Sequence, residues 1–143
     1  MPNPPLSSGL ADWAREHALE YIATNGETGH EWRGVPTLLL TTTGRKSGQP
    51  QLLPLIYGED NGRYIIVASK GGAPGHPAWY LNLAANPSVE VQVKADRFRA
   101  NARTATAEEK PALWELMARI WPAYNDYQAK TTREIPIVIL ERA

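Results

Sequence analysis

The chain has 143 residues, with 15 lysines and arginines against 15 aspartates and glutamates, and it has no cysteine. This size suits one compact domain over residues 1–143, and a net charge of +0 argues against bulk attraction to nucleic acid or to an anionic membrane. The lack of cysteine excludes disulfides, a thiolate nucleophile and cysteine-based zinc or iron–sulfur sites, and with three histidines left we expect no metal centre.

The N-terminal segment, residues 1–9, is polar and rich in proline, and we expect it to form a loose arm. An amphipathic helix is predicted over residues 10–24, with Ser7 or Ser8 as its N-cap. Its inner side chains recur at steps of three and four residues: Leu10, Trp13, His17 and Tyr21. We find no secretory signal and no run of about 18 apolar residues, which favours a soluble, cytoplasmic protein.

Three strands are predicted next, over residues 36–43, 50–58 and 63–69. Each is a short run rich in leucine, isoleucine, valine, threonine or tyrosine, and glycine-containing turn sequences separate the runs. We expect these strands to form a meander. Pro50 and Pro54 place the second strand at a sheet edge or at a bulge, because proline cannot donate to a strand ladder.

Helical segments are predicted at three places in the second half of the chain. The first begins at Pro77 and ends at Asn86, because proline suits the first position of a helix. Thr106 and Glu109 supply a capping box for the second, which Pro122 ends. One or two further helical turns follow that proline.

Strands are predicted around residues 89–93, 97–104 and 135–140, where apolar residues alternate with polar ones or form a buried run. Together with the earlier runs they make six mostly antiparallel strands. So many strands in a short chain should curl into a small barrel, because closure removes exposed sheet edges. The expected fold class is therefore α+β, mainly β, with helices over the ends of the barrel.

Familiar catalytic motifs are missing from the sequence. It has no Gly-x-Gly-x-x-Gly after a strand, no Gly-x4-Gly-Lys-Ser/Thr loop, no His-Glu-x-x-His and no Gly-x-Ser-x-Gly. These absences exclude the Rossmann, P-loop, zincin and serine-hydrolase classes. No pair of carboxylates stands out as a general acid and base.

Two loops carry the residue types that bind anions. Segments 44–48 and 69–73 each combine glycine with hydroxyl and cationic side chains: Arg45, Lys46 and Ser47 in the first, Ser69 and Lys70 in the second. The predicted meander puts both loops at one end of the sheet, where the helix from Pro77 would add its N-terminal amides. We therefore predict an anion site, although a plain hairpin turn and a structural connection are the alternatives.

Five aromatic side chains form a second group near the proposed site: Trp79, Tyr80, Trp121, Tyr124 and Tyr127. Such residues could wall a flat ring and point phenols into a pocket, or they could be core. We favour a core role for Trp79 and Trp121. His76 is expected to orient its loop, and His17 to lie on the inner edge of the first helix.

Three motifs carry a resemblance to a known family: LLTTTGRKSGQP at residues 39–50, PLIY at 54–57 and VASKGGAPGHPAWYLNL at 67–83. Further motifs at residues 86–93, 124–127 and 135–138 fit the same order. In one register over about residues 30–142, the chain resembles the deazaflavin-dependent nitroreductase family.

The resemblance implies a split β-barrel, similar to that of FMN-binding proteins, with coenzyme F-420 in an open groove. Coenzyme F-420 is a deazaflavin with a phosphate and an oligoglutamate tail, which would lie on Arg45, Lys46, Ser47 and Lys70. The other contacts that the family pattern implies are Gln51, Leu52, Leu53, Pro54, Leu55 and Ile56 beside the deazaflavin, Val67, Ala68, Ser69, Ala78, Trp79, Tyr80, Leu81 and Asn82 in the wall, and Tyr124 over the ring.

The activity implied by the resemblance is hydride transfer from reduced coenzyme F-420 to an enone, a coumarin-like lactone, a quinone or a nitroaromatic ring. Tyr124, Tyr127 or Ser69 would donate the proton or stabilise the developing oxyanion, unless solvent does so. An FMN-dependent split-barrel oxidoreductase and a non-catalytic deazaflavin carrier are the alternatives.

The expected partner is a small molecule, and the expected state is a monomer or a weak dimer. The helix over residues 10–24 should pack on the barrel, although in the resembled family such a segment can cover the substrate groove or contact a membrane.

Overall fold

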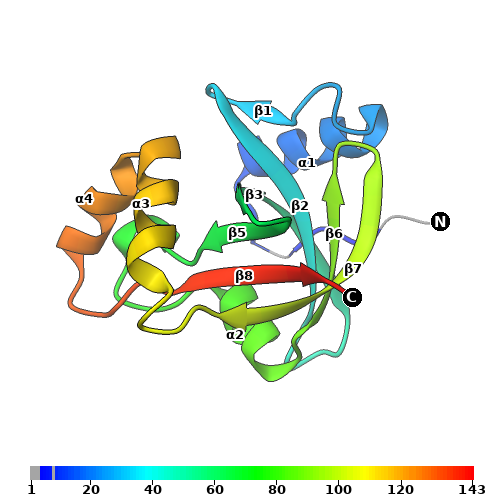
Figure 1. The fold of residues 1–143 in the computed structure, drawn as a ribbon. Helices are drawn as coiled ribbons and strands as arrows, with labels where there is room; N and C mark the ends of the chain where they lie inside the picture. Colours follow the sequence, from blue (N-terminus) through cyan, green and yellow to red (C-terminus); the bar gives the residue numbers. More distant parts are fainter. Residues whose placement is uncertain (1–3, 8) are drawn as a thin grey trace.

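A computed structural model of the chain describes residues 4–7 and 9–143 and places them around one curled sheet (Figure 1). The helices are α1 (Asp12–Thr24), α2 (Ala78–Ala85), α3 (Lys110–Ile120) and α4 (Ala123–Lys130), with one 3-10 turn, η1 (Lys70–Gly72). The strands are β1 (Glu31–Trp32), β2 (Val35–Thr43), β3 (Pro50–Ile56), β4 (Gly58–Asp60), β5 (Arg63–Val67), β6 (Ser88–Val93), β7 (Asp96–Thr104) and β8 (Ile137–Arg142). No helix in these ranges is long and apolar enough to cross a membrane.

The sheet runs β1-β2-β6-β7-β8-β5-β4, with β3 on β2, and all these strand pairs are antiparallel. Figure 1 shows α3 and α4 together on one side, α1 on the opposite side and α2 below the sheet. This arrangement agrees with the predicted α+β split barrel. The described residues hold eight strands instead of the predicted six, because β1 and β4 are too short to show an alternating pattern.

The sheet is open between β3 and β5. Among the described strands β3 pairs with β2 alone, and β5 pairs with β4 and β8. The predicted meander is therefore wrong: the chain leaves β3 at Tyr57, and Asn61 and Gly62, with φ of 51° and 77°, close a hairpin between β4 and β5. Pro50 and Pro54 lie in a regular edge strand, as predicted.

The two faces of the sheet bury separate clusters, because successive side chains of a strand point to opposite faces. On β2, Leu38 and Leu40 belong to the cluster that joins β6, β7, β8 and α2, whereas Leu39 packs with Tyr21 of α1. A third cluster, around Met117, joins α3 and α4 to β5 and β8. Helices on both faces therefore cover apolar surface that the sheet presents.

Tyr21 fixes α1 on the sheet. Its fully buried hydroxyl lies 3.1 Å from the carbonyl oxygen of Thr37 and 3.3 Å from that of Gln92, and it accepts the N–H of Lys94 at 2.7 Å. Burial raises the pKa of Tyr21, so the phenol stays protonated and can donate. One side chain thereby joins α1 to β2 and to the turn after β6.

The start of the chain differs from the prediction. Helix α1 has no side-chain N-cap, so the predicted cap by Ser7 is wrong. The N–H of Ser7 instead donates to the carbonyl oxygen of Leu52 at 2.9 Å, and the N–H of Leu52 donates to Pro5 at 3.0 Å. This part of the predicted loose arm is therefore fixed on the edge of β3. Residues 1–3 and Ser8 lie outside the described residues.

The C-terminal half follows its local signals. Thr106 and Glu109 form the predicted capping box, with the N–H of Thr106 donating to the Glu109 carboxylate at 2.9 Å and the N–H of Glu109 donating to the Thr106 hydroxyl at 3.3 Å. Hydrogen bonds from Arg103 and from the Thr106 amide lower the pKa of Glu109 to about 2. Pro122 ends α3 as predicted, and the last strand begins at Ile137.

His30 links the segment before β1 to the core. Its Nε2 lies 2.8 Å from the hydroxyl of Tyr57, and the two rings meet edge to face. Burial, and secondarily the charge of Lys94, lowers the pKa of His30 below its ordinary value of 6.5. The folded protein therefore favours the neutral imidazole.

We expect the free energy of unfolding to fall as the pH is lowered below 6.5, because the unfolded chain then binds a proton at His30 that the folded chain resists. The loss ends once the pH is below the pKa in the folded state. Urea unfolding between neutral pH and pH ~5 measures it. His30→Gln does not titrate and should lose less stability over this range, and an equal loss in both proteins would contradict the assignment.

Candidate active site

A groove of about 440 Å³ lies at the seam between β3 and β5, within the range of about 300–1,000 Å³ that small-molecule sites occupy. Its walls come from α1, β1, β2, β3, β5, the loop after β5, the start of α2, the link between α3 and α4, and α4. The lining residues are Trp13, His17, Trp32, Thr37, Leu53, Pro54, Leu55, Ile56, Val67, Ser69, Lys70, Gly71, Pro77, Trp79, Trp121, Tyr124 and Tyr127. Because no ladder joins β3 to β5, the groove follows from the strand topology.

The groove gathers ten of the residues that the sequence assigned to the cofactor or to proton transfer: Leu53, Pro54, Leu55, Ile56, Val67, Ser69, Lys70, Trp79, Tyr124 and Tyr127. They come from four separate parts of the chain. Among the described residues, no group of three or more His, Asp or Glu side chains could hold a metal ion.

Two phenols on α4 form one wall of the groove. Tyr124 is buried and its ring lies edge-on to that of Tyr127, with ring centres 6.1 Å apart. Burial raises the pKa of Tyr124, so its phenol is neutral near pH 7. The indole N–H of Trp121 donates to the Tyr127 hydroxyl at 3.4 Å, whereas the described residues give the Tyr124 hydroxyl no hydrogen-bond partner. Both phenols can therefore donate a proton to a ligand.

The loop after β5 has a backbone shape that suits anions. Ser69 is in the right-handed helical region, and Lys70, Gly71 and Gly72 follow with positive φ of 46°, 62° and 83°. A right-handed residue followed by a left-handed one turns successive N–H groups to one side, the nest that binds phosphate and carboxylate groups. The Lys70 side chain adds a cation at the same place.

The other predicted anion loop is exposed, and its residues are not among those that line the groove. Buried Asn82 holds it to α2: the Asn82 Oδ1 accepts the backbone N–H of Arg45 at 3.1 Å and its guanidinium at 2.9 Å. The amide nitrogen of Asn82 donates to Thr42 at 3.2 Å. Helix α2 thus starts at the groove and contacts the Arg45 loop one turn later, so it links the two predicted loops. The side chains of Lys46 and Ser47 are exposed.

Several other predicted contacts lie away from the groove. Leu52 packs beneath α1, on the opposite side of β3 from the position expected for it. Ala68 is fully buried, and the Tyr80 hydroxyl bonds to β7 at 2.8 Å. Gln51, Ala78 and Leu81 do not line the groove either.

Sequence patterns missed two tryptophans of the groove. The predicted inner position of Trp13 is wrong, because its side chain is 58% exposed and stacks on Trp32, with ring centres 5.4 Å apart. Trp32 in turn lies 5.5 Å from Trp121. This tryptophan row joins α1 to the junction of α3 and α4. No local signal reveals it, because its members come from segments about 20 and 90 residues apart in the chain.

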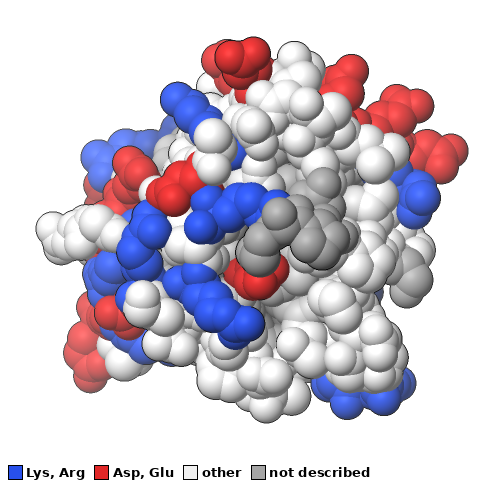
Figure 2. Space-filling model, turned by 90° about the vertical axis from the view of Figure 1, so that its right-hand side faces the viewer, with Lys and Arg blue, Asp and Glu red and all other residues white. Residues whose placement is uncertain are grey.

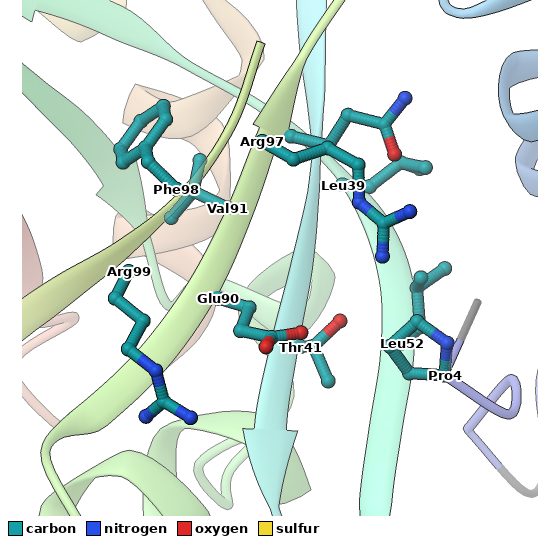
Figure 3. A pocket seen from close by; sticks show the side chains of 10 residues that line it. Pro4, Leu39, Thr41, Leu52, Glu90, Val91, Arg97, Phe98 and Arg99 are labelled. Atoms are coloured by element: carbon teal, nitrogen blue, oxygen red, sulfur yellow. The ribbon is translucent and has the colours of Figure 1, made fainter. Parts of the chain in front are cut away.

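A second hollow, of about 190 Å³, lies between the N-terminal segment and strands β2, β6 and β7. Figure 3 shows Glu90 and Thr41 projecting toward each other, with Arg97 and Arg99 on either side. On the face shown in Figure 2, cationic and anionic side chains are interspersed and neutral residues cover a broad area. Leu52 is the one predicted site residue that lines this hollow.

Comparison with known proteins identifies the family to which the chain is similar. The model of the F420H2-dependent quinone reductase family matches residues 13–142. An F420H2-dependent quinone reductase of Mycobacterium tuberculosis is 43% identical over 132 residues, which cover 90% of this chain and 89% of that protein. The resemblance that the sequence motifs carried is thereby confirmed.

Solved structures support the same assignment. The structure of an F420-H2 dependent reductase (FDR-A) is 47% identical, with a TM-score of 0.69, covering 74% of this chain and 94% of that one. A domain-swapped dimer is 42% identical, with a TM-score of 0.72, covering 91% of this chain and 98% of that one. The chain therefore belongs to the F420H2-dependent quinone reductase family, and its cofactor is reduced coenzyme F-420.

Proposed function

We propose that this protein transfers a hydride from reduced coenzyme F-420 to an electron-poor acceptor, with a quinone as the first candidate. Enones, coumarin-like lactones and nitroaromatic rings are further candidates. The observation that carries the proposal is the groove at the open seam, which combines apolar strand residues, a loop whose backbone suits an anion and the two phenols of α4. The name of the family and of the relative in Mycobacterium tuberculosis supports a quinone.

The residues of the groove fit the cofactor. Leu53, Leu55 and Val67 offer apolar surface on the two strands that flank the seam, which suits a flat ring. Lys70 and the backbone of its loop suit a phosphate, and Arg45, held by Asn82, lies on the other side of α2 as a cation for an acidic tail. When bound, the reduced cofactor supplies the hydride.

The chain's own residues then have two tasks. The first is to hold an acceptor in the groove, where the tryptophan row and Trp79 offer flat apolar walls. The second is to deliver a proton or to stabilise a developing oxyanion. The neutral phenol of Tyr124 has no partner among the described residues and faces the groove, so it is the first candidate. Tyr127 and Ser69 are the next.

The loop over residues 44–48 gives the first test of the proposed function. We expect the double variant Arg45→Ala/Lys46→Ala to bind coenzyme F-420 at least about tenfold more weakly, because each charged hydrogen bond contributes about 1.5–3 kcal/mol. Titration followed by cofactor fluorescence measures the affinity. Arg99→Ala/Arg119→Ala removes the same charge from two exposed residues outside the groove and should bind normally.

FMN in parallel titrations distinguishes the alternatives. Wild-type protein that binds FMN and not coenzyme F-420 would favour an FMN enzyme. Tight binding of coenzyme F-420 without oxidation of its reduced form by any acceptor would favour a carrier. Undiminished binding by the Arg45 and Lys46 double variant would show that the tail lies elsewhere.

The phenols give the second test. We expect Tyr124→Phe to lower kcat for quinone reduction about a hundredfold, because a positioned proton donor contributes about 10²–10⁴ in rate. Stopped-flow oxidation of saturating reduced cofactor measures this rate. Tyr64→Phe removes a phenol outside the groove and should keep normal turnover. If Tyr124→Phe and Tyr127→Phe both keep wild-type turnover, neither tyrosine is the donor.

A further inference from the structure

Arg133 lies in the link between α4 and β8, and its side chain reaches across to the loop after β5. Its Nε donates to the carbonyl oxygen of Ala73 at 2.8 Å, and its Nη2 donates to that of Ser69 at 2.7 Å. Its Nη1 lies 3.3 Å from the carbonyl oxygen of Ala68 and 3.1 Å from the Nδ1 of His76. One guanidinium therefore holds four acceptors from a segment of nine residues, 68–76.

No carboxylate within the described ranges forms an ion pair with this guanidinium. Carbonyl dipoles and one imidazole nitrogen are its partners, and burial lowers the pKa of Arg133. The planar guanidinium presents its donors in a fixed fork, so it specifies the positions of the carbonyl groups that it binds. A surface salt bridge would impose no such shape on the loop.

The backbone around Arg133 is hydrogen-bonded to α4, the helix that carries Tyr124 and Tyr127. Gln128 of α4 donates to the Arg133 carbonyl oxygen at 2.8 Å and accepts the N–H of Ile135 at 3.0 Å. Helix and loop also meet directly, since a Cβ on Gly72 would lie 2.6 Å from the carbonyl oxygen of Tyr127. Arg133 thus connects the loop that contains Ser69 and Lys70 to helix α4.

The direction of these hydrogen bonds has a consequence for the loop amides. In a trans peptide unit the C=O and the N–H point to opposite sides. Because the carbonyl groups of Ala68 and Ser69 point at Arg133, the N–H groups of Ser69 and Lys70 point away from it. Ser69 and Lys70 line the groove and Arg133 does not, which is the arrangement that amides turned away from Arg133 and toward a ligand require.

We propose that Arg133 is a positioning residue for the cofactor phosphate: it draws the carbonyl groups of residues 68, 69 and 73 to one side and so presents the loop amides to the anion. This inference rests on the proposed function, which places the phosphate at this loop. Arg133 is not among the residues that line the groove, so it would act through the loop. Its guanidinium also leaves one positive charge behind the loop, which adds to the attraction for an anion.

The test compares Arg133→Gln and Arg133→Lys with wild-type protein and with Arg142→Gln, an exposed arginine outside the groove. Two readouts are used. Hydrogen exchange of the unliganded protein reports on the amides of residues 68–76. Fluorescence titration compares coenzyme F-420 with two shortened forms of the same deazaflavin, one that keeps the phosphate but lacks the tail and one that lacks both, so that the ratio of affinities between the two shortened forms isolates the phosphate.

For Arg133→Gln we expect faster exchange in residues 68–76 and a loss of about tenfold or more in affinity for coenzyme F-420 and for the shortened form that keeps the phosphate, with little change for the form that lacks it. Arg133→Lys keeps the positive charge but loses the planar set of guanidinium donors, so it should show the same selective loss of affinity for coenzyme F-420. It also serves as the second variant if Arg133→Gln fails to fold. Arg142→Gln should behave as wild type in both readouts.

Three results would overturn the inference. They are unchanged exchange in residues 68–76, an equal loss of affinity for both shortened forms, and wild-type affinity in Arg133→Lys, which would show that charge alone matters. Wild-type protein that binds none of these ligands would instead contradict the proposed function, and the exchange of the unliganded variants would then decide separately whether Arg133 shapes the loop.

Discussion

The absence of a strand ladder between β3 and β5 is the constraint on which the rest of the structure depends. A sheet that closed at this point would bury the inner surface of both strands and leave no room for a flat ligand. After β3 the chain forms the short hairpin of β4 and β5, in which β5 pairs with β4 and β8. Strand β5 therefore lies near β3 but does not pair with it. The groove is therefore a product of topology, and side chains only decide its chemistry.

The walls of the groove divide that chemistry between two ends. The two phenols come from α4 and the tryptophan row comes from α1, β1 and the link between α3 and α4, whereas Lys70 and the nest come from the loop after β5. Arg133, Gln128 and the close approach at Gly72 join the loop to α4. These contacts fix the position of the loop relative to the helix that carries the two phenols.

Local signals in the sequence predict local structure well here. The capping box at Thr106 and Glu109 and the stop at Pro122 can be identified because the residues involved are neighbours in the chain. Ten of the residues that the family motifs implied line the groove, although they come from four separate parts of the chain, because each motif is itself a short continuous segment. The tryptophan row and Arg133 could not be predicted, because each joins distant segments through side chains whose neighbours only the tertiary fold decides. The missing ladder escaped prediction because consecutive strands usually pair.

The open edge of β3 also bears on how the protein avoids aggregation. An unpaired strand is a template on which another chain can add a strand, and proteins blunt such edges with proline or with a covering segment. Here Pro50 and Pro54 remove two backbone donors from β3, and the segment around Leu6 covers the strand at Leu52. The seam can thus stay open as a groove while it discourages the addition of a second β-strand.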